Sequence, residues 1–119
     1  MGVKPYHITV IGTSMGGYIA IKVSNNIKYK EVKYVFVGCC TNEDDNSQHS
    51  QTLYGNILSI YEDSDTIGSS CKNLIDKSIS TTKFREVKIN TGMKHGFLFK
   101  ALPEWLEPTI NWIRNTNKK

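Results

Sequence analysis

Residues 7–20 read HITVIGTSMGGYIA, and this stretch decides the fold because it joins a strand to a helix through a very short turn. The β-branched run His7–Ile11 ends at Gly12, which predicts a strand. The residues that follow, Met15–Val23, carry apolar side chains at helical spacing and predict an amphipathic helix. A strand that passes directly into a helix is typical of α/β proteins.

The rest of the chain alternates in the same way. Further strands are predicted at Val32–Val37, Asn56–Tyr61 and Phe84–Ile89, with helices at Ser69–Lys77 and in a closing segment that ends near Asn115. The polar stretch Thr41–Gln51 predicts a surface loop. Strands that alternate with helices form parallel sheets with helices on their faces. We therefore expect a single α/β domain over residues 1–119, with a parallel sheet of about four strands and flanking helices.

Composition favours an ordinary globular protein. The chain has 119 residues, of which 39% are hydrophobic and 22% charged. No apolar run approaches the ~20 residues of a membrane span, and the amino terminus lacks the features of a signal peptide. The net charge of +4 comes from lysines spread along the chain, which indicates a solvated surface and not a nucleic-acid-binding face. We expect a cytoplasmic protein that binds neither membrane nor nucleic acid.

The three cysteines do not predict a disulfide framework or a metal site. Cys39, Cys40 and Cys71 are odd in number and lack the C-x-x-C spacing of metal and redox motifs. A disulfide and a zinc site are therefore not expected, and reduced, mostly buried thiols are.

The turn after the first strand has the composition of a nucleophile elbow. Gly12–Gly16 matches G-x-S-x-G between a strand and a helix, so that Ser14 would be the nucleophile. The tight turn predicts strained backbone angles at the serine and small residues two positions before and after it. The N–H of Met15 would then donate to an oxyanion, helped by the helix dipole. The alternatives are a glycine-rich turn that simply packs closely and one that cradles a phosphate, but neither common glycine-rich phosphate motif is present.

A serine nucleophile needs a base to take its proton. Among the three histidines, His7 falls inside the predicted first strand and His49 in the polar loop. His95 follows the last predicted strand, in the glycine-flanked loop Asn90–Gly96, and is the candidate base.

The base needs a carboxylate that fixes its tautomer. Asp65 is the candidate, although its neighbours Asp63 and Glu62 are close, any of the three could be an ordinary turn residue, and Asp63 could substitute. Because the carboxyl ends of parallel strands meet at one edge of the sheet, Ser14, Asp65 and His95 are expected there together.

These motifs together resemble the α/β-hydrolase superfamily. Residues 8–20 resemble its nucleophile region, residues 57–67 its acid-bearing strand and loop, and residues 94–97 its histidine loop. The chain order Ser, Asp, His also fits. The resemblance implies esterase- or lipase-like hydrolysis of small acyl esters through an acyl-enzyme, with Ser14, Asp65 and His95 as the triad and with no metal or organic cofactor.

The sequence departs from this family at its front. Members ordinarily have several more strands before the nucleophile strand, and their other oxyanion donor lies there, which leaves the Met15 N–H as the only family-type donor. The lid that many members carry is replaced by the loop from Cys39 to Leu53, so no lid domain is expected.

The first strand would also be an uncovered edge. We therefore expect a homodimer that pairs these edges, or a partner chain that completes the sheet. The alternative to an enzyme is a catalytically silent hydrolase-like module, or a fragment, that acts in binding or assembly.

Overall fold

The computed structural model describes residues 2–40, 53–78 and 80–115. The elements follow in the order η1 (Pro5–His7), β1 (Thr9–Thr13), α1 (Met15–Ile27), β2 (Lys33–Val37), β3 (Tyr54–Glu62), α3 (Lys72–Lys77), β4 (Ser80–Ile89), η2 (Lys94–Phe99) and α4 (Pro103–Arg114), where η denotes a 3₁₀-helix.

The four strands form one parallel sheet in the order β1-β2-β3-β4. Its register aligns Ile11 of β1 with Val35 of β2, and Val35 with Leu58 of β3. Every residue of β2 is buried, as expected for a parallel strand that is covered on both faces. The prediction of an α/β fold with a four-stranded parallel sheet and flanking helices is confirmed.

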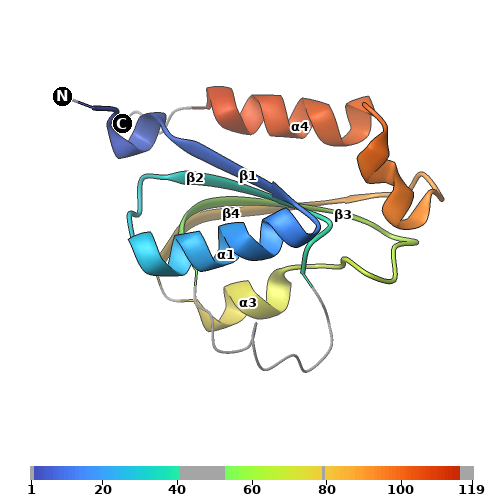
Figure 1. Cartoon of the computed structure of the whole chain (residues 1–119), viewed down its shortest axis with the longest axis horizontal. Coiled ribbons are helices and arrows are strands. Elements are labelled where there is room, and N and C mark those ends of the chain that lie inside the picture. Colours follow the sequence, from blue (N-terminus) through green and yellow to red (C-terminus); the bar gives the residue numbers. More distant parts are fainter. Residues whose placement is uncertain (1, 41–52, 79, 116–119) are drawn as a thin grey trace.

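Helices cover both faces of the sheet. Helices α1 and α3 lie on one face and α4 on the other (Figure 1). The side chains of β2 alternate accordingly: Tyr34 and Phe36 pack in the cluster under α1 and α3, while Val35 and Val37 pack with Trp112 of α4. None of the helices in the described ranges is long and apolar enough to cross a membrane.

Some element bounds differ from the sequence prediction. His7 is not in the first strand but in η1, because Pro5 at the first helical position fixes a φ angle that suits a helical turn. Helix α3 begins at Lys72 and not at Ser69, because the Ser69 N–H donates to the Cys40 carbonyl, 2.7 Å away. The polar loop Thr41–Gln51 and most of the segment expected in place of a lid lie outside the described residues.

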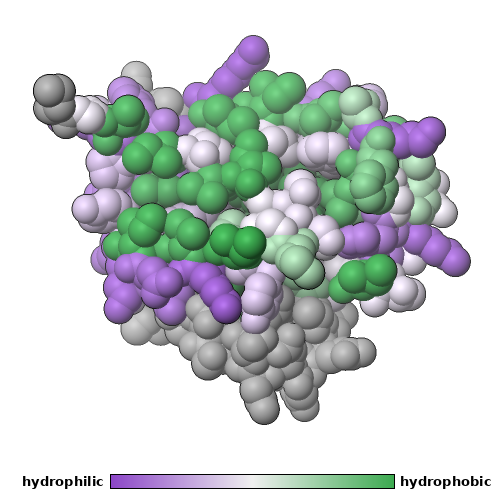
Figure 2. All heavy atoms as spheres, viewed as in Figure 1, coloured by the Kyte–Doolittle hydropathy of each residue, from purple (hydrophilic) through white to green (hydrophobic). Residues whose placement is uncertain are grey.

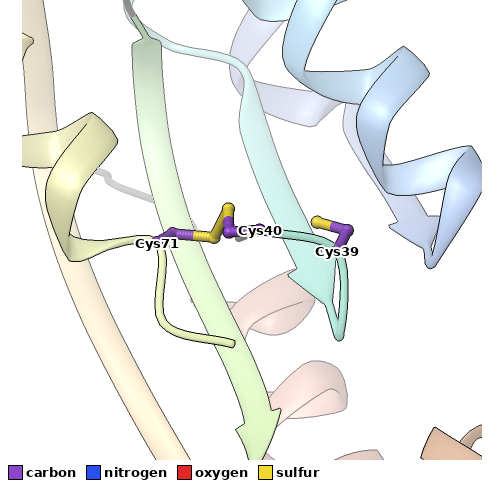
Figure 3. Close-up of side chains that lie close together, drawn as sticks. All are labelled: Cys39, Cys40 and Cys71. Atoms are coloured by element: carbon purple, nitrogen blue, oxygen red, sulfur yellow. A yellow bond between two sulfur atoms is a disulfide. The ribbon is translucent and has the colours of Figure 1, made fainter. Parts of the chain in front are cut away.

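The expectation of three reduced thiols is wrong for two of them. Cys40, just after β2, and Cys71, just before α3, form a disulfide, while Cys39 is a buried thiol outside this bond (Figure 3). Spacing rules could not predict this pair because its residues are 31 positions apart. They meet because Cys40 forms an antiparallel bridge with Ser69, which brings the Cα atoms of the two cysteines to 5.1 Å.

Strand β1 forms an edge of the described sheet, since it pairs only with β2. Its side chain Ile11 is 48% exposed, and Ile8 just before it is 36% exposed. Figure 2 shows apolar side chains gathered over β1 and the adjoining side of α1. This edge is therefore both unpaired and apolar within the part of the chain that the structure describes.

Candidate active site

Ser14 occupies the sharp turn between β1 and α1. Its backbone angles, φ 51° and ψ −121°, lie where non-glycine residues are rare and strained. The turn is held by hydrogen bonds from the Ser14 N–H to the Val37 carbonyl and from the Gly17 N–H to the Ser14 carbonyl, both 3.0 Å. This geometry agrees with the strained elbow that the sequence predicts.

The small residues that the elbow requires are not quite those expected. A Cβ on Gly12 would lie 2.5 Å from the Gly17 Cα, so Gly12 is needed. A Cβ on Gly16 would meet nothing within 4 Å, whereas one on Gly17 would lie 2.4 Å from the Cβ of Cys39. The close approach downstream of the serine is therefore made by Gly17, which lets α1 pack against the end of β2.

His95 lies in η2, after the carboxyl end of β4, and reaches Ser14. Its Nε2 is 2.9 Å from Ser14 Oγ, and its Nδ1 is 2.6 Å from Oδ2 of Asp65. An ionised carboxylate can only accept, so Nδ1 carries the proton and Nε2 accepts from the serine hydroxyl. This is the tautomer that a general base requires.

Asp65 is fixed by the backbone around it. Its side chain is fully buried, and its Oδ1 accepts hydrogen bonds from the N–H groups of Ile67 and Gly68. These bonds leave Oδ2 facing His95. Asp63, the alternative acid, is exposed and lies 3.8 Å from the Lys88 ammonium. The carboxylate that meets His95 is therefore that of Asp65.

The N–H of Met15 is available at the first position of α1. The first N–H groups of a helix have no intrahelical acceptor, and the positive end of the helix dipole lies there. An oxyanion formed next to Ser14 would meet this donor.

Glu62 connects the loops that carry Asp65 and His95. It ends β3 with a side chain that is fully buried. Its Oε1 accepts from the N–H and hydroxyl of Thr91, and its Oε2 accepts from the N–H and hydroxyl of Ser64 and from the Gly92 N–H. Burial raises the pKa of this carboxyl, but the hydrogen bonds from Thr91 and Ser64 outweigh burial and lower the pKa to about 2. The sequence suggested Glu62 only as a neighbouring acid and gave no sign of this network.

The cysteines form the one cluster of possible metal ligands in the described ranges. The sulfur atoms of Cys39, Cys40 and Cys71 lie within 4.8 Å of one another. Two of them are bonded to each other, and burial raises the pKa of the Cys39 thiol to about 12. A protonated thiol is a poor ligand and a poor nucleophile, so this cluster does not suit a metal ion in this state.

His7 takes no part in the hydrogen bonds that join Ser14, His95 and Asp65. His7 is exposed in η1, where its ring packs edge-on against Tyr6. His49 lies outside the described residues.

Comparison with family models, curated proteins and solved structures finds no match to this chain.

Proposed function

We propose that this chain is a serine hydrolase that cleaves small acyl esters through an acyl-enzyme. The observation that carries the proposal is the continuous hydrogen-bonded series from Asp65 through His95 to Ser14, with the serine held in a strained turn at the start of a helix. A serine, a histidine of the correct tautomer and a buried carboxylate in this order form the arrangement that activates a hydroxyl nucleophile.

The reaction would follow from these contacts. Ser14 Oγ attacks the ester carbonyl while its proton passes to Nε2 of His95, and Asp65 stabilises the resulting imidazolium. The Met15 N–H donates to the oxyanion of the tetrahedral intermediate. His95 then returns the proton to the leaving alcohol. Water, activated by the same base, hydrolyses the acyl-serine, and these steps call for no metal or organic cofactor.

The rate is expected to be modest. The Met15 N–H is the one oxyanion donor that the sequence identifies, and the absence of a second donor of this kind typically lowers kcat by a factor of about 10²–10³. We therefore expect reactive, activated esters to be turned over faster than unactivated ones.

Exposed apolar residues that are close to Ser14, Asp65 and His95 along the chain favour an apolar acyl group. Met15 follows Ser14 directly, Ile67 comes two residues after Asp65, and Phe99 lies in the same short helix as His95. These side chains are 77%, 65% and 87% exposed. Apolar side chains around a polar reacting centre are the usual lining of small-molecule sites.

The test is labelling with a fluorophosphonate followed by intact mass measurement. We expect stoichiometric labelling of the wild type and none of the Ser14→Ala variant. His95→Ala retains the serine and should also fail to react at a measurable rate. A panel of esters of increasing acyl length then identifies the preferred substrate. A folded wild-type protein that takes no label contradicts the proposal.

A second candidate function is assembly without catalysis. The observation that favours it is the unpaired, apolar edge at β1, where Ile8 and Ile11 are exposed. Edges of this kind add strands from other chains. On this alternative two copies pair their β1 edges into one continuous sheet, and a small-molecule ester is not the physiological partner.

Sedimentation velocity tests whether two copies of the chain associate through β1. We expect the wild type to sediment as a dimer, and Ile11→Lys to sediment as a monomer because a charge at the paired edge opposes association. A wild type that stays monomeric at high protein concentration contradicts self-association through β1.

A further inference from the structure

Glu62 has the surroundings of a group that sets the geometry of the triad without touching the substrate. None of the hydrogen bonds described for its side chain comes from Ser14, Asp65 or His95, although its backbone carbonyl accepts from the Asp65 N–H at 3.0 Å. Instead, it accepts five hydrogen bonds from two loops, one of which carries Asp65 and the other His95. A buried carboxylate with this many donors is held firmly in its ionised form.

The two hydroxyls that donate to Glu62 also accept hydrogen bonds from the backbone just before His95. Ser64 Oγ donates to Glu62 and accepts from the Lys94 N–H at 3.0 Å, while Thr91 Oγ1 donates to Glu62 and accepts from the Met93 N–H at 3.2 Å. Met93 and Lys94 are the two residues before His95, and Lys94 has a φ of 55°. Because Glu62 uses the hydroxyl protons, each hydroxyl presents a lone pair to the backbone that leads into His95.

We propose that Glu62 is a positioning residue of the triad: its carboxylate joins the acid loop to the histidine loop and so fixes His95 against Asp65. This inference rests on the proposed function, since the triad is its object. The Asp65–His95 bond, at 2.6 Å, also joins these two loops. Such a bond keeps its geometry only if the backbones on both sides are held, and the network around Glu62 holds them.

Glu62→Gln tests the proposal because no orientation of the amide satisfies the site. If the amide nitrogen replaces Oε1, it faces the N–H and hydroxyl of Thr91, and if it replaces Oε2, it faces the N–H and hydroxyl of Ser64. One hydroxyl can turn to accept from the amide, but the backbone N–H of Thr91 or Ser64 beside it cannot, so that N–H loses its acceptor and the loop that carries it must shift. The variant is nearly isosteric, so it changes the hydrogen bonds with little change of packing.

The first readout is the tautomer of His95, measured from the ¹⁵N shifts of a histidine-labelled protein and assigned by comparison with His95→Ala. We expect the wild type to carry its proton on Nδ1 and Glu62→Gln to give a mixture of the two tautomers. This readout does not depend on activity. A wild type without labelling by the fluorophosphonate would thus contradict the proposed function and leave the tautomer test of Glu62 intact.

The second readout is the rate of fluorophosphonate labelling. We expect Glu62→Gln to label about 10–100-fold more slowly, because a misplacement near 1 Å at a catalytic group costs about that much. If Glu62→Gln does not fold, Ser64→Ala takes its place, since it removes only the hydroxyl between Glu62 and the Lys94 N–H. For this variant we expect a smaller decrease in the same direction and a partial shift of the tautomer.

Glu86→Gln is the matched control. Glu86, on β4, accepts from Ser59 Oγ, Ser70 Oγ and the Cys71 N–H, and none of these donors belongs to the histidine loop. We expect Glu86→Gln to lower the midpoint of thermal unfolding while its His95 tautomer and labelling rate stay within twofold of wild type. The proposal is overturned if folded Glu62→Gln keeps the wild-type tautomer and rate, or if Glu86→Gln changes both equally.

Discussion

Asp63 and Asp65 show how two residues of one type, two positions apart, acquire different roles. Asp65 lies where the chain turns back after β3, so that the N–H groups of Ile67 and Gly68 converge on one of its oxygens. Gly68 then passes so close to Gly38 that a Cβ would lie 2.1 Å from the Gly38 carbonyl oxygen. Asp63 faces solvent beside Lys88, where an exposed ion pair contributes little.

This contrast gives a prediction with a built-in control. We expect Asp65→Asn to slow fluorophosphonate labelling by a factor of about 10²–10⁴, because an amide cannot fix the base in the correct tautomer. Asp63→Asn should label at a rate within about twofold of wild type. Both rates are measured at one pH by the time course of intact mass, and a larger effect at Asp63 would reverse our assignment of the acid.

Gly16 and Gly17 also have different surroundings, although they are neighbours in α1. Gly17→Ala brings a methyl group within 2.4 Å of the Cys39 Cβ, which forces α1 away from β2, and we expect a loss of about 1–3 kcal/mol in the free energy of unfolding. Gly16→Ala has open space and should be neutral or more stable by up to about 1 kcal/mol. Urea unfolding of the two variants measures the difference, and equal losses would contradict the packing described for Gly17.

The depressed pKa of Glu62 predicts how stability depends on pH. Burial alone would raise this pKa, but the hydrogen bonds lower it from 4.5 to about 2 in the folded protein. The stabilisation is therefore fully present above about pH 4.5 and is lost as the pH falls toward 2. We expect the difference in unfolding free energy between wild type and Glu62→Gln to be constant from pH 7 to 5 and to shrink below pH 4.5. A difference that does not change down to pH 2.5 would show that Glu62 has an ordinary pKa.

At the scale of elements, buried parallel strands were the part of the fold that sequence could predict. Strand β2 lies between two neighbours and under helices on both faces, so all of its residues after Lys33 are apolar or aromatic, which is a clear strand signal. The first half of β4, Ser80–Lys83, is polar and carries no such signal. It becomes strand because it lies beside β3, where Tyr54 pairs with Ser80.

The meeting of Ser14, Asp65 and His95 could be predicted for a related reason. Each of Ser14, Asp65 and His95 follows the carboxyl end of a different strand, and parallel topology brings those ends to one edge. The hydrogen-bond network around Glu62 could not be predicted, because its donors Thr91 and Gly92 come 29 and 30 residues later in the chain. Sequence shows an acid in a turn, whereas burial and long-range donors make it a fixed anion.

On the scale of the whole molecule, the disulfide links regions that secondary structure alone leaves independent. It joins the end of β2 to the segment between Asp65 and α3, inside the apolar cluster under α1 and α3. The Glu62 network holds the same acid loop to the histidine loop. The acid loop is therefore fixed from both sides, to β2 by a covalent bond and to the β4 end of the sheet by hydrogen bonds.

Thiol counting tests this link directly. We expect one reactive thiol, that of Cys39, in the denatured and unreduced protein and three after reduction. Because the bond closes a loop of 31 residues, we expect reduction or a Cys40→Ser and Cys71→Ser double variant to lower the unfolding free energy by about 2–4 kcal/mol. Cys39→Ser alone should leave the disulfide intact and serves as the control.

Disulfides persist mainly in oxidising compartments, so a count of one in freshly isolated protein would argue against the cytoplasmic location that the sequence predicts. A count of three would contradict the bond and favour that location.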